Sequence, residues 1–156
     1  MYNPNIHKRK SIRLKGYDYS QEGYYFITIC TQGRQKIFGK IIKDEMVLSR
    51  YGLEAQKILV NLQRRLGQKI SINSYIIMPN HIHLILILKK NNIINLKDFI
   101  TTYKSVVSKK INKKESIKLW QRNYYEHIIR NEKELYAITE YIENNPKNWD
   151  KDSLKA

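Results

Sequence analysis

The segment MPNHIHLILIL contains two histidines, His81 and His83, with one residue between them, at the start of an apolar run. In a strand, successive side chains point to opposite faces, so both imidazoles would project from one side and Ile82 and Leu84 from the other. Two neighbouring imidazole nitrogens suit a divalent metal ion. Because His-x-His is a short motif, a pair of half-exposed histidines near a strand end fits the same spacing. The spacing alone leaves both interpretations open.

The chain has only four histidines, so a third histidine ligand is scarce. His127 lies in a separate strand-like segment, where it is a metal ligand, a donor to a phosphate, or a core histidine bonded to backbone. Of these three roles we favour the last two. His7 lies in a basic leader and receives no site role.

A second segment with chemical potential is NEKELYAITEYIENNP. Asn131 predicts the N-cap of a helix, with Glu132 and Glu134 in its first turn. Pro146 predicts its end, because a proline disfavours helical geometry in the residue before it. On such a helix, the apolar stripe that faces the core consists of Leu135, Ile138 and Ile142.

Tyr141 and Asn145 are one turn apart on this expected helix and share a face beside the apolar stripe. If the helix packs against the histidine strand, the phenol and the amide oxygen approach the same metal-bound phosphate. Asn145 would then complete a His, His, Asn ligand set, and its neutral oxygen would leave the metal strongly polarising. The ordinary alternatives are a packing tyrosine, one of 12 in the chain, and an asparagine that ends a helix.

The remaining elements follow from periodicity and turn residues. The segment Gly23–Thr31 predicts a strand, which we expect to continue through Gly33 into a hairpin with Lys36–Ile42. Leu53, Ile58, Leu59, Leu62 and Leu66 predict an amphipathic helix over Arg50–Leu66. The other expected elements are strands over Ile70–Met78 and His81–Leu88 around a Pro79–Asn80 turn, a helix from Leu96 to about Lys113, and a strand-like stretch over Trp120–Ile129.

The order strand, helix, strand, strand, helix, strand and final helix predicts an α+β fold. We expect a ferredoxin-like split βαβ antiparallel sheet with helices packed on one face, followed by a C-terminal helix that carries Tyr141. With no internal repeat or low-complexity linker, residues 1–156 are expected to form a single domain, of which residues 1–16 are a flexible basic leader.

The net charge of the chain indicates what kind of molecule it binds. Lysine and arginine number 29 against 14 acidic residues, a formal net charge of +15, which favours a polyanion. The apolar run from Ile82 to Leu88 is much shorter than the roughly 20 residues of a membrane span, and no apolar segment follows the basic N-terminus. A single cysteine, Cys30, excludes an internal disulfide and a cysteine-based zinc site. We therefore expect a cytoplasmic, nucleoid-associated protein with no membrane partner.

Taken together, four stretches resemble the REP-associated tyrosine transposases, a group within the single-tyrosine HUH transposases. The stretches are RKSIRLKGYDYSQEGYYFITICTQGR, MPNHIHLIL, LWQRNYYEHIIRNEKEL and YIENNPKNW. The resemblance implies His81 and His83 as metal ligands, Tyr141 as the nucleophile and Asn145 as the third, helical ligand. It also implies Mg²⁺ or Mn²⁺ and single-stranded or hairpin DNA, with relatives working as monomers or homodimers. The chain stops seven residues after Trp149, whereas many relatives carry a longer tail.

On this hypothesis the chain nicks and rejoins DNA through a 5′-phosphotyrosine intermediate. DNA contacts are expected from lysines and arginines that neutralise phosphates and from a tyrosine that stacks on unpaired bases. A solvated surface charge is the alternative for each residue. The set comprises Arg9, Arg13, Lys15, Tyr17, Lys104, Lys109, Lys110, Arg122, His127 and Arg130, with Lys8 and Lys10 in the same leader.

Two other classes of protein share some of these features. A non-catalytic nucleic-acid-binding module of ferredoxin-like fold, or an inactive, domesticated transposase, shares the fold and charge, but such a module does not need His81 beside His83. A phosphodiesterase with paired His-x-Thr motifs is disfavoured, because neither His81 nor His127 is followed two residues later by threonine or serine.

Overall fold

The computed structural model describes residues 23–67, 69–89, 95–112 and 118–155. A four-stranded antiparallel sheet has the strand order β4-β5-β1-β6. Its strands are β1 (Gly23–Cys30), β4 (Ile70–Met78), β5 (His81–Leu88) and β6 (Tyr125–Ile129). The helices are α1 (Arg50–Arg65), α2 (Leu96–Ile111) and α3 (Glu132–Glu143). Because β5 lies between β1 and β4, and β1 between β5 and β6, both βαβ units are split, which confirms the ferredoxin-like prediction.

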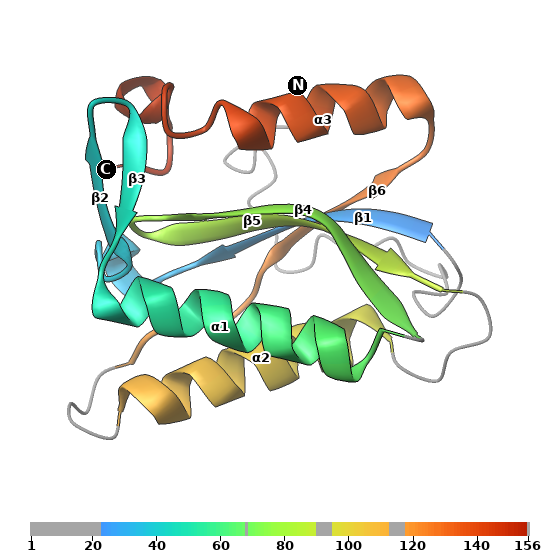
Figure 1. The fold of residues 1–156 in the computed structure, drawn as a ribbon, viewed down its shortest axis with the longest axis horizontal. Coiled ribbons are helices and arrows are strands. Elements are labelled where there is room, and N and C mark those ends of the chain that lie inside the picture. The colour runs from blue at the N-terminus through green and yellow to red at the C-terminus, as the bar shows by residue number, and fades with distance from the viewer. Residues whose placement is uncertain (1–22, 68, 90–94, 113–117, 156) are drawn as a thin grey trace.

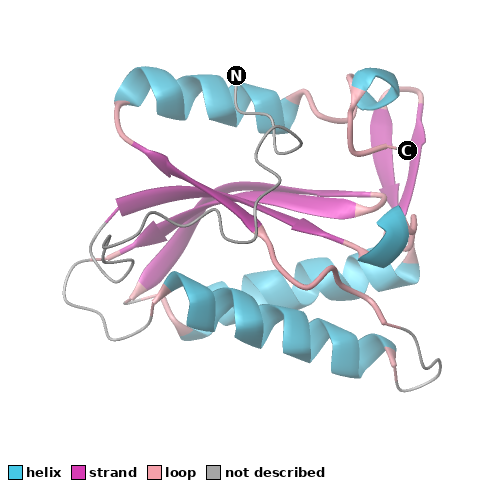
Figure 2. Ribbon diagram, turned by 180° about the vertical axis from the view of Figure 1, so that it is seen from behind, coloured by secondary structure: helices cyan, strands magenta, loops and turns pink. Residues whose placement is uncertain are grey.

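The sheet separates two layers of helices (Figures 1 and 2). Helices α1 and α2 cover one face, as expected, and α3 crosses the opposite face. Both central strands are buried almost throughout, because helices cover both of their faces. Each strand therefore sends alternate side chains into two different cores.

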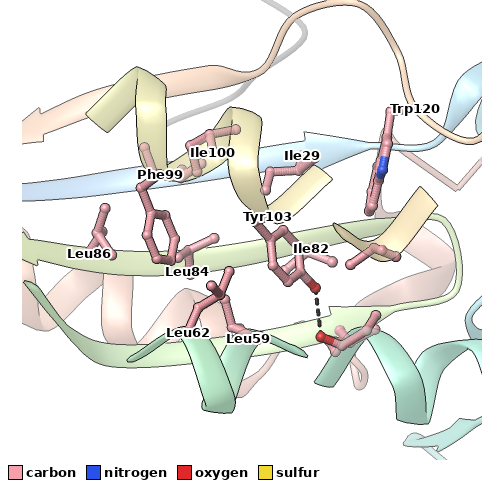
Figure 3. Close-up of a cluster of buried hydrophobic side chains, with 14 of the residues drawn as sticks. Ile29, Leu59, Leu62, Ile82, Leu84, Leu86, Phe99, Ile100, Tyr103 and Trp120 are labelled. Atoms are coloured by element: carbon pink, nitrogen blue, oxygen red, sulfur yellow. Dashed lines mark hydrogen bonds between the residues drawn. The ribbon is translucent and has the colours of Figure 1, made fainter. Parts of the chain in front are cut away.

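The larger core lies between the sheet and helices α1 and α2 (Figure 3). Ile82 and Leu84 of β5 enter this core, as the alternation predicts. Leu59 and Leu62 of the α1 stripe are buried there, whereas Leu53 of the same stripe is 47% exposed. The smaller core lies under α3 and includes Ile138 and Ile142, with Leu135 packed against it.

The helix boundaries follow their caps. Ser49 caps α1 by accepting from the Gly52 amide, and Asn95 caps α2 by accepting from Asp98. Asn131 caps α3 as predicted, accepting from the Glu134 amide. Helix α3 ends at Glu143, before the expected end at Pro146. Asn145 therefore lies in a turn after the helix, because the proline that follows it disfavours helical geometry at position 145.

The predicted hairpin between the first strand and Lys36–Ile42 is wrong. Both edges of β1 are already paired, with β5 and β6. The chain instead turns away at Gly33 and Arg34, which have positive φ, and forms a separate hairpin of β2 (Gly39–Ile42) and β3 (Glu45–Leu48). Gly39 is required there, because a Cβ would meet the Val47 carbonyl oxygen at 2.1 Å. The strand expected over Trp120–Ile129 is confined to β6, and Trp120 forms only an isolated bridge with Thr31.

The two helices of the larger core are tied by one buried hydrogen bond. The Tyr103 hydroxyl of α2 donates to the Ala55 carbonyl of α1 at 2.8 Å (Figure 3). Tyr103→Phe should therefore lower the free energy of unfolding by about 1 kcal/mol, measured by urea denaturation. The control is Tyr136→Phe on α3, where the side chain is 74% exposed and the expected change is within about 0.5 kcal/mol. Equal effects of the two variants would contradict this assignment.

Candidate metal and tyrosine site

The histidine pair lies at the beginning of β5. His81 and His83 point to the sheet face under α3, and each is 0% exposed. Their ring centroids are 4.6 Å apart, with the rings inclined by 69°. The same-face prediction is thus confirmed, but the surface alternative is wrong for this pair, since both rings are fully covered.

Tyr141 reaches the pair from α3. Its ring centroid lies 5.4 Å from that of His83 and 6.2 Å from that of Phe26 on β1. The side chain is partly buried and packs against the smaller core. The last turn of α3 therefore holds a phenol over the histidine strand.

Asn145 arrives from the turn that follows α3. Its amide hydrogen bonds to the Ile142 carbonyl at 3.2 Å, so the chain tightens as the helix ends. The side chain is 2% exposed, and its Oδ1 lies 3.3 Å from His81 Nε2. The structure thus brings His81, His83, Tyr141 and Asn145 together, although Asn145 is not helical as expected.

A residue that the sequence indicated only as part of a turn fixes the tautomer of His81. Asn80 is buried, and its Nδ2 donates to the Leu154 carbonyl at 2.6 Å. Its Oδ1 therefore faces His81 Nδ1, at 2.7 Å, and can only accept. His81 must carry its proton on Nδ1, which leaves a lone pair on Nε2, the atom that faces Asn145.

His83 has a similar supporting contact. Its Nδ1 lies 2.8 Å from the hydroxyl of Thr28, which is fully buried on β1. Its Nε2 is buried and has no hydrogen-bond partner within the described residues. When Nδ1 donates to Thr28, Nε2 presents a lone pair. Each histidine is thus held through Nδ1, and for His81 this contact also leaves Nε2 as an acceptor.

Burial keeps both imidazoles neutral. It lowers the pKa of His81 to about 4, with Arg34 adding to the shift and Asp152 and Asn145 opposing it. Burial also lowers the pKa of His83 well below its usual value, and the neighbouring His81 lowers it further. Neutral imidazole is the form that binds metal ions, so both side chains are in the ligand state near neutral pH.

Burial shifts the pKa of Tyr141 upward, opposite in direction to the shift of the histidines. It raises the pKa of Tyr141 to about 12, and the charge of Asp152 adds to the shift, while a hydrogen bond with Asn145 opposes it. The phenol is therefore protonated near neutral pH. Any chemistry at its oxygen needs a partner that stabilises the phenolate.

These donors fit a divalent cation. His81 Nε2 and Asn145 Oδ1 are both acceptors, yet they face each other at 3.3 Å, an arrangement that a positive ion between them would favour. Within the described ranges, no three His, Cys, Asp or Glu side chains are grouped so as to hold one ion, so a three-ligand site here would need the Asn145 amide oxygen. Cys30 is not a candidate, because burial raises the pKa of its thiol to about 12.

The expected DNA-contacting residues are scattered. Arg9, Arg13, Lys15 and Tyr17, with Lys8 and Lys10, lie outside the described residues. Lys104, Lys109 and Lys110 lie on α2, across the sheet from α3, and Lys104 Nζ donates to the Gln121 carbonyl at 2.7 Å. The structure therefore does not bring these helix lysines to the histidine pair.

The other basic candidates lie near β6. Arg122 is exposed and precedes β6, at the sheet end where His81 pairs with Cys30. Arg130 is also exposed but follows Ile129, which pairs with Tyr24, six residues along β1 from Cys30. This register separates Arg130 from the histidine end of the sheet, and its contact with DNA stays a prediction. His127 bonds to Glu134 of α3, a partner that none of its expected roles included.

Comparison with known proteins assigns the chain to a family. Residues 19–145 match the family described as "Transposase IS200 like", and the chain belongs to that family. The described helices include none that is long and apolar enough to cross a membrane.

Two relatives carry the name expected from the sequence. A REP-associated tyrosine transposase of Escherichia coli K12 is 22% identical, over 82% of this chain and 68% of its own. A putative REP-associated tyrosine transposase from Haemophilus influenzae is 29% identical, over 83% of this chain and 73% of its own. An uncharacterised H. influenzae protein is 37% identical, over 98% of this chain and 96% of its own. The resemblance to REP-associated tyrosine transposases is thereby confirmed.

Solved structures share the fold. A REP-associated tyrosine transposase bound to a REP hairpin superposes with a TM-score of 0.66 and 19% identity, over 87% of this chain and 73% of that one. A putative transposase from Deinococcus radiodurans gives a TM-score of 0.54 and 18% identity, over 85% and 95%.

The tautomer of His81 can be measured directly. In metal-depleted protein near neutral pH, a long-range ¹H–¹⁵N spectrum should show neutral His81 with its proton on Nδ1, because Asn80 Oδ1 only accepts. On acidification, the His81 signals should titrate with a midpoint of about 4. Asn80→Ala should remove the Nδ1 preference. A proton on Nε2 in the unmodified chain would refute the assignment.

Proposed function

We propose that this chain is a metal-dependent transposase that nicks and rejoins single-stranded DNA carrying a hairpin, with Tyr141 as the nucleophile. The observation that carries the proposal is the convergence of two neutral, buried imidazoles, an amide oxygen and a phenol at one end of the sheet. Family membership supports the transposase class. The structural relative that was solved in complex with a REP hairpin supports hairpin DNA as the substrate.

His81, His83 and Asn145 would hold a Mg²⁺ or Mn²⁺ ion, through Nε2 of each histidine and Oδ1 of the amide. When bound, the ion supplies Lewis-acid chemistry that draws charge from the scissile phosphate and orients it. Asn80 and Thr28 hold the two rings through Nδ1, so that both lone pairs keep their direction. The histidines therefore act without having to lose a proton near neutral pH.

Tyr141 would attack the phosphorus through its phenol oxygen. The new bond links this oxygen to the 5′ phosphate, the bond to the 3′ oxygen breaks, and that oxygen leaves as a hydroxyl with a proton that comes overall from the phenol. The hydrogen bond with Asn145 lowers the pKa of the phenol against the effect of burial, so Asn145 helps to stabilise the developing phenolate.

Attack by the 3′ hydroxyl of another strand on the phosphotyrosine restores the diester and releases Tyr141. The bond energy is conserved in the covalent intermediate, so no external energy source is needed. With one nucleophile in the motif, one subunit makes one nick at a time. We expect a monomer or homodimer that stays with the nucleoid, with Arg122 as the described candidate for DNA contact at the histidine end of the sheet.

The covalent step can be tested with a hairpin-bearing single strand and Mg²⁺ or Mn²⁺. The unmodified chain should form a protein–DNA adduct that survives denaturant, and Tyr141→Phe should form none, since phenylalanine has no attacking oxygen. Adducts are detected by denaturing electrophoresis of labelled DNA. The matched control is Tyr136→Phe on the same helix, which should retain full activity because Tyr136 is exposed.

An adduct that persists in Tyr141→Phe would disprove the assignment of the nucleophile. If no DNA in a broad panel of hairpins and flanking sequences forms an adduct, the non-catalytic module or the domesticated transposase becomes the better description. In that case hairpin binding would persist without cleavage, which a filter-binding assay would detect.

Metal dependence is tested separately. Chelation should abolish nicking, and added Mn²⁺ should restore it. His83→Ala should lower the nicking rate by about 100-fold or more, since it removes a ligand rather than a supporting residue. Tyr136→Phe is again the control, because Tyr136 is exposed on α3 and has no role at this site. Nicking by His83→Ala at the rate of the unmodified chain would contradict the ligand assignment.

A further inference from the structure

A buried carboxylate to which the sequence assigned no role lies beside the histidine pair. Asp152 follows the short helix η2 (Trp149–Lys151), and its side chain is 4% exposed. Its Oδ1 accepts from the Leu154 amide at 2.8 Å. Its Oδ2 lies 3.8 Å from His81 Nε2, is buried, and has no hydrogen-bond partner within the described residues.

The segment that carries Asp152 is fastened to the site at several points. Trp149 stacks on His81 with ring centroids 6.2 Å apart and an interplanar angle of 25°. Arg34 donates to the Ser153 carbonyl at 3.1 Å, and Asn80 donates to the Leu154 carbonyl at 2.6 Å. Asp152 is thus held in place by contacts on both sides of it in the chain.

The carboxylate of Asp152 and the acceptor atoms beside it favour a bound cation. A buried carboxylate oxygen without a partner is costly, because it has lost its hydration. His81 Nε2, which lies 3.8 Å from Oδ2, carries a lone pair, since Asn80 fixes the proton on Nδ1. Two acceptors therefore face each other again, as at Asn145. The ligands proposed above are all neutral, and Mg²⁺ sites normally include one or two carboxylates.

We propose that Asp152 is the anionic partner of the metal site and acts through a metal-bound water, not as a direct ligand. This inference rests on the proposed function. The water-mediated mode follows because Asp152 is not grouped with the two histidines closely enough for one ion to bind all three directly. Mg²⁺ retains several of its waters in protein sites, so a carboxylate just outside the ligand shell accepts from one of them.

The test measures Mn²⁺ binding to the full chain by electron paramagnetic resonance of the free ion. Asp152→Asn keeps the oxygen that accepts from Leu154 but removes the charge, and should weaken Mn²⁺ binding by about 10- to 100-fold. Asp152→Ala, which cannot donate to His81, should weaken it at least as much. The matched control is Asp150→Asn, which makes the same change in net charge at an exposed residue paired with Lys155.

Asp150→Asn should leave Mn²⁺ affinity nearly unchanged, because a solvated charge is screened. The number of waters on bound Mn²⁺, from water-proton relaxation, should be the same in Asp152→Asn and in the unmodified chain. A gain of one water would show direct ligation and overturn the water-mediated role. Affinity in Asp152→Asn or Asp152→Ala equal to that of Asp150→Asn would overturn any role for Asp152 at the metal.

Failure of this inference is distinguishable from failure of the metal site. His83→Ala, measured in the same way, should lose Mn²⁺ binding. If His83→Ala loses binding while both Asp152 variants bind as the control does, only the role of Asp152 is disproved. If the unmodified chain does not bind Mn²⁺, the metal site and the inference are both disproved. Thermal unfolding of the metal-free variants checks that each remains folded.

Discussion

Strand β5 contributes side chains to the cores on both faces of the sheet. Helices cover both faces of the sheet, so every second side chain of this central strand enters a different core. Ile82 and Leu84 supply apolar surface to the larger core, while His81 and His83 face α3. A shift of one residue in register would exchange the two sets and bury imidazoles among apolar side chains. The site is therefore a direct consequence of strand pairing.

Exclusion of water from this layer has opposite consequences for its two kinds of group. It lowers the pKa of the imidazoles and keeps them neutral, which is the form that can bind a metal ion. It raises the pKa of the phenol and keeps it protonated, which is the form that is a poor nucleophile. Asn145 contacts both kinds, through His81 Nε2 and the phenol of Tyr141. One amide thus links the histidine pair to the tyrosine, and its hydrogen bonds oppose the effect of burial on the pKa of both His81 and Tyr141.

Local signals were enough to predict much of this. The alternation in HIHLILIL defined the histidine face, and Asn131 with the apolar stripe of α3 defined the tyrosine helix. The β2–β3 hairpin was missed because its pairing depends on β1 having no free edge, which is a property of the whole sheet. The positions of Asn80 and Asp152 beside the histidine pair were not predicted, because they depend on contacts between residues distant in sequence. Asn145 was predicted on a helix that in fact ends before it, at Glu143.

The contact between Asn80 and the Leu154 carbonyl joins residues 74 positions apart. It orients the Asn80 amide, which in turn sets the proton on His81. Contacts of such long sequence separation form late, because closing the intervening chain costs entropy that local structure does not repay. A chain in which this contact has not formed therefore contains both histidines without a fixed proton position on His81. The proton position on His81 is therefore a property of the completely folded chain and not of strand β5 alone.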